Sequence, residues 1–184
     1  MARDNNDLLG KFLEDAHHNA KATCVNLPAE YKLLSNIDEL FYKVISRLGQ
    51  ASELIAGFFL FRMHSSFRAA ADLCLAGQVA EAYAILRGCL ENALYGLYVA
   101  GNEDRQKVWL RRHNNEASLR RVRNEFTIAN VLNNLRSIDT AMHETARALY
   151  ERTIDLGGHP NERATSTQVE ICSPTNQDIH VRAE

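Results

Sequence analysis

The chain has 184 residues, of which 46% are hydrophobic and 24% are charged, and its formal net charge is −2 at pH 7. This length fits one domain with one hydrophobic core, and the composition excludes a disordered chain. The small negative charge excludes a polycation that coats nucleic acid. Only three prolines occur, which favours long helices over a loop-rich β fold.

Two helical segments are predicted in the first part of the chain. Apolar residues recur at helical spacing over residues 7–20, which predicts a short amphipathic helix, and residues 25–30 are typical of a linker. Ser35 and Asp38 have the pattern of a capping box, which predicts the start of a second helix. This long helix is expected to continue to residue 76, with a bend near one of its two glycines.

A glycine separates this long helix from the next one. Gly77 is expected to end the first helix, and helical spacing then continues over residues 78–100 until Gly101. Because almost no residues lie between the two helices, we predict an antiparallel αα-hairpin. Positions equidistant from Gly77 should lie at the same height, and this places His64 beside Glu91.

Four polar residues in this apolar hairpin are expected to form a cluster. Arg68 follows His64 by one helical turn and Arg87 precedes Glu91 by one turn, so each pair shares a helix face. Such groups need partners, because burying a polar group alone costs several kcal/mol. The cluster is therefore predicted either to fix the register of the helices or to line a ligand-binding or catalytic pocket.

Further helices are predicted in the second half of the chain. Asn102 is expected to cap one helix, which Asn114-Asn115 interrupts. A helical stripe then resumes over residues 119–132. Asp139 is expected to cap a last helix, which the double glycine at 157–158 ends.

After residue 163 the helical pattern gives way to alternation. Residues 168–172 and 178–182 alternate polar and apolar side chains around a Ser-Pro-Thr-Asn turn, which predicts a C-terminal β-hairpin. Two strands alone are marginally stable, so this hairpin must pack on the helices or on another subunit. We therefore predict a mainly α, antiparallel helical bundle over residues 1–164, with a β-hairpin over residues 165–184 packed on the same domain.

Targeting and metal-binding patterns are missing from the sequence. The N-terminal residues lack the apolar segment of a signal peptide, and the most apolar run, residues 54–61, is too short to span a bilayer. The four cysteines form no CxxC pair, and no HExxH or glycine-rich phosphate loop occurs. We expect a cytoplasmic protein without a membrane segment, a metal or a cofactor.

A basic segment between residues 105 and 123 contains seven Arg or Lys residues and one acid. On an unbroken helix, part of this set would form one stripe. The stripe is predicted either as a solvated helix face or as a phosphate-binding surface. The candidate phosphate-binding residues are Arg105, Arg112, Arg120 and Arg123.

Arg152 and His159 form a candidate catalytic pair. Arg152 lies in the last turns of the last predicted helix, and His159 follows the double glycine, with Asn161 as a further candidate binding residue. A histidine beside an arginine can deprotonate a hydroxyl and stabilise negative charge on phosphorus, which is the chemistry of metal-independent RNA cleavage. The alternative is a loop histidine that bonds to nearby backbone.

The Leu-Arg-x-x-x-Glu motif at residues 86–91 and the His-Pro-Asn motif at residues 159–161 resemble a group of bacterial proteins with a HEPN-like core. The resemblance covers about the central two thirds of the chain. It implies a small helical bundle, commonly homodimeric. In many members it also implies metal-independent RNA cleavage in toxin–antitoxin or phage-defence systems. By this resemblance, Arg152 would hold a phosphate and His159 would act on the 2′-hydroxyl or the leaving group.

Three functions are therefore predicted. The first is a bacterial stress or phage-defence protein that acts on RNA as a metal-independent endoribonuclease. The second is a non-catalytic homodimeric interaction module. The third is a small-ligand binding protein with a polar pocket between the two central helices.

Overall fold

The computed structural model describes residues 7–47, 54–158, 169–172 and 180–183 of the chain. This part of the chain is mainly α-helical, as predicted. Its helices are α1 (Leu8–Asn26), α2 (Pro28–Arg47), α3 (Leu54–Leu75), α4 (Val79–Val99), α5 (Glu103–Leu110), α6 (Glu116–Glu125), α7 (Ile128–Ile138) and α8 (Thr140–Thr153). A π-helical turn, η2 (Ile154–Gly158), continues α8.

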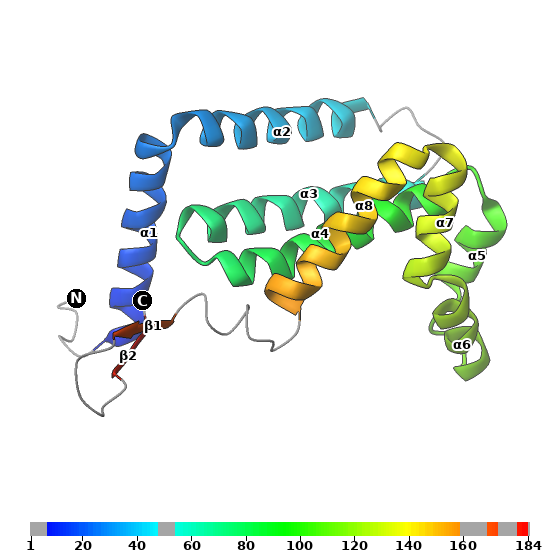
Figure 1. Ribbon diagram of the computed structural model, residues 1–184. Coiled ribbons are helices and arrows are strands. Elements are labelled where there is room, and N and C mark those ends of the chain that lie inside the picture. Colours follow the sequence, from blue (N-terminus) through cyan, green and yellow to red (C-terminus); the bar gives the residue numbers. More distant parts are fainter. Residues whose placement is uncertain (1–6, 48–53, 159–168, 173–179, 184) are drawn as a thin grey trace.

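Helices α3 and α4 form an antiparallel hairpin at the centre of the molecule (Figure 1). Gly77 closes the turn between them with a φ of +91°, a value that glycine adopts without strain. Gly96 of α4 packs closely on α3, because a Cβ added there would lie 3.1 Å from the Cβ of Phe59. The predicted αα-hairpin with its turn at Gly77 is confirmed.

The hydrophobic core lies where α4 packs against α5, α6, α7 and α8. Three aromatic rings surround Phe126: the ring centres of Tyr95, Tyr98 and Trp109 lie 5.5, 5.3 and 5.3 Å from its own. Other buried members of this core come from six helices: Phe59, Leu94, Val99, Val108, Val122, Val131, Leu132, Leu135 and Ala146. The core therefore belongs mainly to the second half of the chain.

Two breaks divide the segment that follows α4. Asn115 caps α6, with its side chain accepting a hydrogen bond from the Ser118 amide, and Thr127 caps α7 in the same way through the Asn130 amide. The continuous stripe predicted over residues 119–132 is thus wrong, because α6 and α7 are separate helices. The basic residues of the segment are likewise divided between α5, α6 and the turn that joins them.

The N-terminal helices also differ from the prediction. Only Leu27 separates α1 from α2, so the predicted linker over residues 25–30 is wrong. Pro28 is the first residue of α2, where its missing N–H leaves no helical hydrogen bond unmade. Ser35 and Asp38 lie inside α2 rather than at its start, so the predicted capping box is wrong as well.

Helix α2 runs along α3, and α1 lies beyond the turn of the central hairpin (Figure 1). Every residue of α1 and α2 is described, and none of them is buried. By contrast, α3 and α4 contain four buried residues each. We refer to α1 and α2 together as the N-terminal arm.

Two short strands, β1 (Val169–Cys172) and β2 (His180–Ala183), pair in antiparallel fashion with Ile171 opposite Val181. The residues that join them, and those that join β1 to η2, lie outside the described residues. The packing of a hairpin on the helices and the boundary near residue 164 therefore stay predictions. None of the described helices is long and apolar enough to cross a membrane.

Candidate functional site

Asp38 connects α2 to α3 through two basic side chains. Its Oδ1 accepts hydrogen bonds from His64 Nε2 and Arg68 Nε, both at 2.6 Å, and its Oδ2 accepts one from Arg68 Nη2 at 2.8 Å. Such two-point arginine–carboxylate pairs are among the stronger hydrogen bonds in proteins. We call Asp38, His64 and Arg68 the α2–α3 latch, because they fix how α2 is rotated against α3.

Aromatic packing completes the latch around its histidine. His64 is only 8% exposed, and the ring of Phe41 stacks on it with 4.9 Å between ring centres. The ring centre of Phe67 lies 5.4 Å from that of Phe41. A buried imidazole is thus supplied with both a hydrogen-bond partner and an apolar cover, which satisfies the condition for burying a polar group.

Hydrogen bonds from Arg68, and next from His64, hold the pKa of Asp38 well below its usual range. The hydrogen bonding between Arg68 and Asp38 also raises the pKa of Arg68. A carboxylate with a lowered pKa in the folded state stabilises the fold at pH values above its unfolded pKa. This contribution is lost as the pH falls through the lower, folded-state pKa.

An Asp38→Asn variant is expected to be less stable than the wild type, by an amount that depends on pH. The difference in urea midpoint should narrow below about pH 4, where the unfolded-state carboxyl becomes protonated. Asp104→Asn, at an exposed carboxylate of α5, is the matched control and should show a smaller difference. A difference in urea midpoint between wild type and Asp38→Asn that stays unchanged down to pH 3 would contradict the role given to the latch.

A second polar cluster joins α4 to α8. Arg87 donates from Nε to Glu91 Oε1 at 3.0 Å and from Nη2 to Tyr150 Oη at 3.0 Å, and Tyr150 Oη donates to the same glutamate oxygen at 3.4 Å. The guanidinium also lies 5.3 Å from the centre of the Tyr150 ring. Since all three side chains bond to one another, the cluster ties α8 to the central hairpin.

The predicted direct pairing of His64 with Glu91 is wrong, although the predicted height is correct. Cys89 donates from Sγ to the carbonyl oxygen of Met63 at 3.4 Å, so residues next to the two predicted partners do meet. However, His64 bonds to Asp38 of α2, whereas Glu91 bonds within the cluster on α8. In the described part of the chain, the two predicted pairs thus belong to separate polar clusters.

The four candidate phosphate-binding arginines have different surroundings. Arg105 is held within the fold: it donates from Nη1 to the Tyr98 carbonyl at 3.0 Å and to Asn134 Oδ1 at 2.9 Å. Arg112 lies 5.7 Å from the centre of the Trp109 ring. Arg120 and Arg123 are exposed on α6. The single stripe predicted for an unbroken helix is thus wrong.

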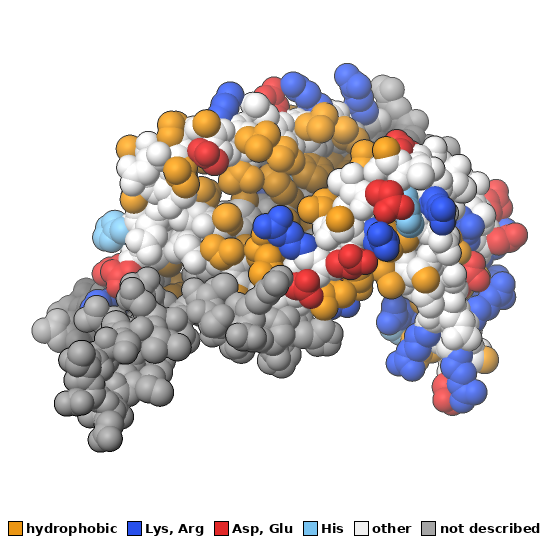
Figure 2. Space-filling view, in the orientation of Figure 1, with side chains coloured by type: hydrophobic (Ala, Val, Ile, Leu, Met, Phe, Trp, Pro, Cys, Tyr) orange, Lys and Arg blue, Asp and Glu red, His pale blue; other side chains and the backbone are white. Residues whose placement is uncertain are grey.

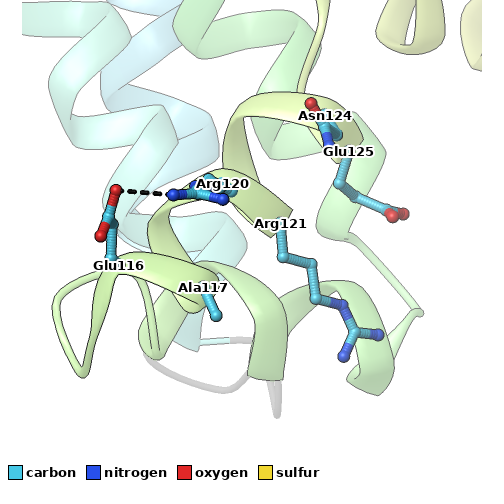
Figure 3. Close-up of a pocket in the computed structure, with 6 residues that line it drawn as sticks. All are labelled: Glu116, Ala117, Arg120, Arg121, Asn124 and Glu125. Carbon is cyan, nitrogen blue, oxygen red and sulfur yellow. Dashed lines mark hydrogen bonds and ion pairs between the residues drawn. The ribbon is translucent and has the colours of Figure 1, made fainter.

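A shallow pocket lies on α6, lined by Glu116, Ala117, Arg120, Arg121, Asn124 and Glu125 (Figure 3). Arg120 donates from Nη2 to Glu116 Oε1 at 2.8 Å, which neutralises its charge. Figure 3 shows Arg121 extending in a different direction from Arg120. Since the lining also contains two carboxylates and its two arginines diverge, the pocket is a poor match for a phosphate.

The predicted catalytic pair is only half described. Arg152 is exposed at the end of α8, with its guanidinium 6.0 Å from the centre of the Tyr83 ring. His159 and Asn161 lie outside the described residues, so the pair stays a prediction. Gly157 shows where the chain runs just before His159: it packs directly on the backbone of α4 between Ala80 and Ala84.

Asp38 belongs to the latch, although the sequence pattern predicts it as part of a helix cap. The signal that reveals it is the apolar spacing around it, because Leu34, Phe41 and Ile45 lie on the same face of a helix as Asp38. An acid on an apolar helix face needs a basic partner. The described residues hold no group of three or more His, Cys, Asp or Glu side chains that could bind a metal.

No protein-family model, curated protein or solved structure matches the chain. A functional proposal therefore depends on the surfaces and clusters described above.

Proposed function

We propose that the protein is a non-catalytic helical interaction module that forms a homodimer through its N-terminal arm. The observation that supports this most directly is that α1 and α2, of 19 and 20 residues, contain no buried residue. In water, most of the stability of a protein helix comes from packing an apolar face against other parts of the structure. A partner that covers the apolar faces of α1 and α2 would therefore stabilise both helices.

The arm exposes apolar side chains that a partner would cover. The large ones are Leu8, Leu9, Phe12, Leu13, Val25, Leu27, Tyr31, Leu33, Leu40, Tyr42 and Val44. Figure 2 shows hydrophobic side chains gathered along α2 and in the hollow beneath it. Single exposed apolar residues are normal, but a set that follows one pair of helices is typical of a protein-binding surface.

The α2–α3 latch gives this surface a fixed orientation. Asp38 bonds to two residues of α3, and Phe41 stacks on one of them. The rotation of α2 is thus set before a partner arrives, which lowers the ordering cost of binding. In this proposal the latch is a positioning element.

Sedimentation equilibrium of the full chain tests the proposal. The chain has a mass of 20.7 kDa, and we expect a mass that approaches twice this value as the concentration rises through the micromolar range. A single 20.7 kDa species at all concentrations would remove the proposal.

A second candidate function is metal-independent RNA cleavage by a HEPN-like bundle. It is supported by the exposed guanidinium of Arg152, which lies at the end of α8 a few residues before His159. In buffer with EDTA, the wild type should cleave a labelled single-stranded RNA and the His159→Ala variant should not. Arg47→Ala, at an exposed arginine of α2, serves as the control. Intact RNA with the wild type, or unchanged cleavage by His159→Ala, would remove this candidate.

A further inference from the structure

We infer that the homodimer forms along a seam on α2, which packs in parallel against the same seam of a second copy. The seam consists of Leu33, Ile37, Leu40 and Val44. This inference rests on the proposed function and adds to it the contact surface and the partner, a second α2.

The spacing of the seam residues is that of a two-stranded coiled coil. Their separations are four, three and four residues, which is the d, a, d, a pattern of a heptad repeat. Leucine occupies both d positions, and the β-branched residues Ile37 and Val44 occupy both a positions. This combination favours parallel two-stranded packing over trimers and tetramers.

The latch leaves most of this seam exposed. Asp38 points at α3, and Leu40, two residues later, is rotated by about 200° around the helix axis. Accordingly, Leu33 and Leu40 are each 60% exposed and Val44 is 42% exposed. Ile37, the fourth seam residue, is half-buried. The seam therefore lies along the flank of α2, and three of its four residues are open to a second molecule.

The residues beside the seam are compatible with a second α2. In the heptad register, the g position after Leu40 is Lys43, whose Nζ lies 2.8 Å from Glu39 Oε1. In a parallel pair the two copies of this lysine lie on opposite sides of the seam, so they do not repel each other across it. The e positions are Leu34 and Phe41, which extend the apolar surface toward α3. A short seam of this kind buries less than the roughly 800 Å² per partner of a standard interface, so we expect micromolar affinity.

Helix α1 has a related pattern at Leu9, Leu13, Ala16 and Ala20, which makes it the competing partner. However, its last two seam positions are alanines. Small residues at these positions contribute less buried area than the leucine, isoleucine and valine of α2. A symmetric contact between two copies of α2 is therefore favoured over a contact between α2 and the partner's α1.

The first experiment compares two lysine substitutions by sedimentation equilibrium, with circular dichroism to confirm folding. Leu40→Lys places two charges opposite each other in the seam and should weaken dimerisation by at least about 100-fold. Leu110→Lys, at an equally exposed leucine of α5, should dimerise like the wild type. If the wild type dimerises and Leu40→Lys dimerises equally well, the inferred seam is wrong and the proposed function still stands. A monomeric wild type would remove both.

The second experiment determines which helices meet, and it does not depend on the lysine variant. In a parallel seam Leu33 faces its own copy, so Leu33→Cys should form an intermolecular disulfide under mild oxidation faster than the wild type does. In an antiparallel seam the two copies of this position are about 16 Å apart along the helix. Dimers in which Leu33→Cys gains no cross-link would contradict parallel pairing of α2 with itself.

Discussion

Replacing Gly157 by alanine is expected to destabilise the protein by about 3 kcal/mol. A Cβ at this position would lie 2.5 Å from the carbonyl oxygen of Ala80, 2.5 Å from the amide nitrogen of Ala84 and 2.8 Å from the Cβ of Tyr83. Two of these atoms belong to the backbone of α4 and cannot rotate away. The π-helical turn η2 would have to move off α4, which would disturb the packing where α8 ends.

Urea unfolding checks this expectation against a second glycine variant. Gly88 lies within α4, and a Cβ added there meets no atom within 4 Å. Because alanine is favoured over glycine in a helix by about 1 kcal/mol, Gly88→Ala should be neutral or stabilising. Equal stability of Gly157→Ala and the wild type would contradict the close contact between η2 and α4.

Truncation of Phe126 is expected to cost about 3–5 kcal/mol of the free energy of unfolding. This side chain is 5% exposed and lies among the rings of Tyr95, Tyr98 and Trp109. Phe126→Ala would leave a cavity between α4, α5 and the turn from α6 to α7. Neighbouring rings could fill it only in part, since Tyr95 is also fixed by its hydrogen bond to the Phe126 carbonyl at 2.8 Å.

The control for this variant is Phe58→Ala, at a phenylalanine of α3 that is 56% exposed. Surface substitutions of this kind usually change stability by less than about 0.5 kcal/mol. Chemical denaturation of both variants in parallel gives the two values. Similar losses for the two phenylalanines would show that the core does not lie where the structure places it.

Several local features of this fold could be predicted from the sequence. The turn at Gly77 is encoded by one glycine between two apolar helices, and Asn102 and Asp139 cap helices as expected. Their side chains accept hydrogen bonds from the amides of Arg105 and Met142 at 3.0 and 2.9 Å. Turns and caps depend on a few adjacent residues, so short sequence patterns are sufficient to locate them.

Helix boundaries near ambiguous signals were less predictable. Pro28 suggests a break, yet it also fits the first turn of a helix, and only the structure shows that α2 begins there. Ser35 and Asp38 resemble a cap, but a cap needs a helix start, and the apolar pattern extends on both sides of them. Thr127 is the opposite case, since the apolar stripe conceals a cap that divides α6 from α7.

The position of the polar residues along the central hairpin could be predicted, but their hydrogen-bond partners could not. The helical rise determines how far along the hairpin His64 and Glu91 lie, and this part was correct. Which way each side chain faces depends on how each helix is rotated, and this is set by packing against α2 on one side and α8 on the other. His64 therefore bonds to a residue 26 positions earlier, and Glu91 to one 59 positions later.

Hydrogen exchange measured at two protein concentrations tests the central claim most directly, because it reports on α2 in the unmodified chain. If the arm dimerises through α2, the amides of residues 33–44 should exchange more slowly at the higher concentration, while those of the Phe126 core should be unaffected. Exchange of the α2 amides at the same rate at both concentrations, across the range in which a dimer should form, would contradict self-association through this helix.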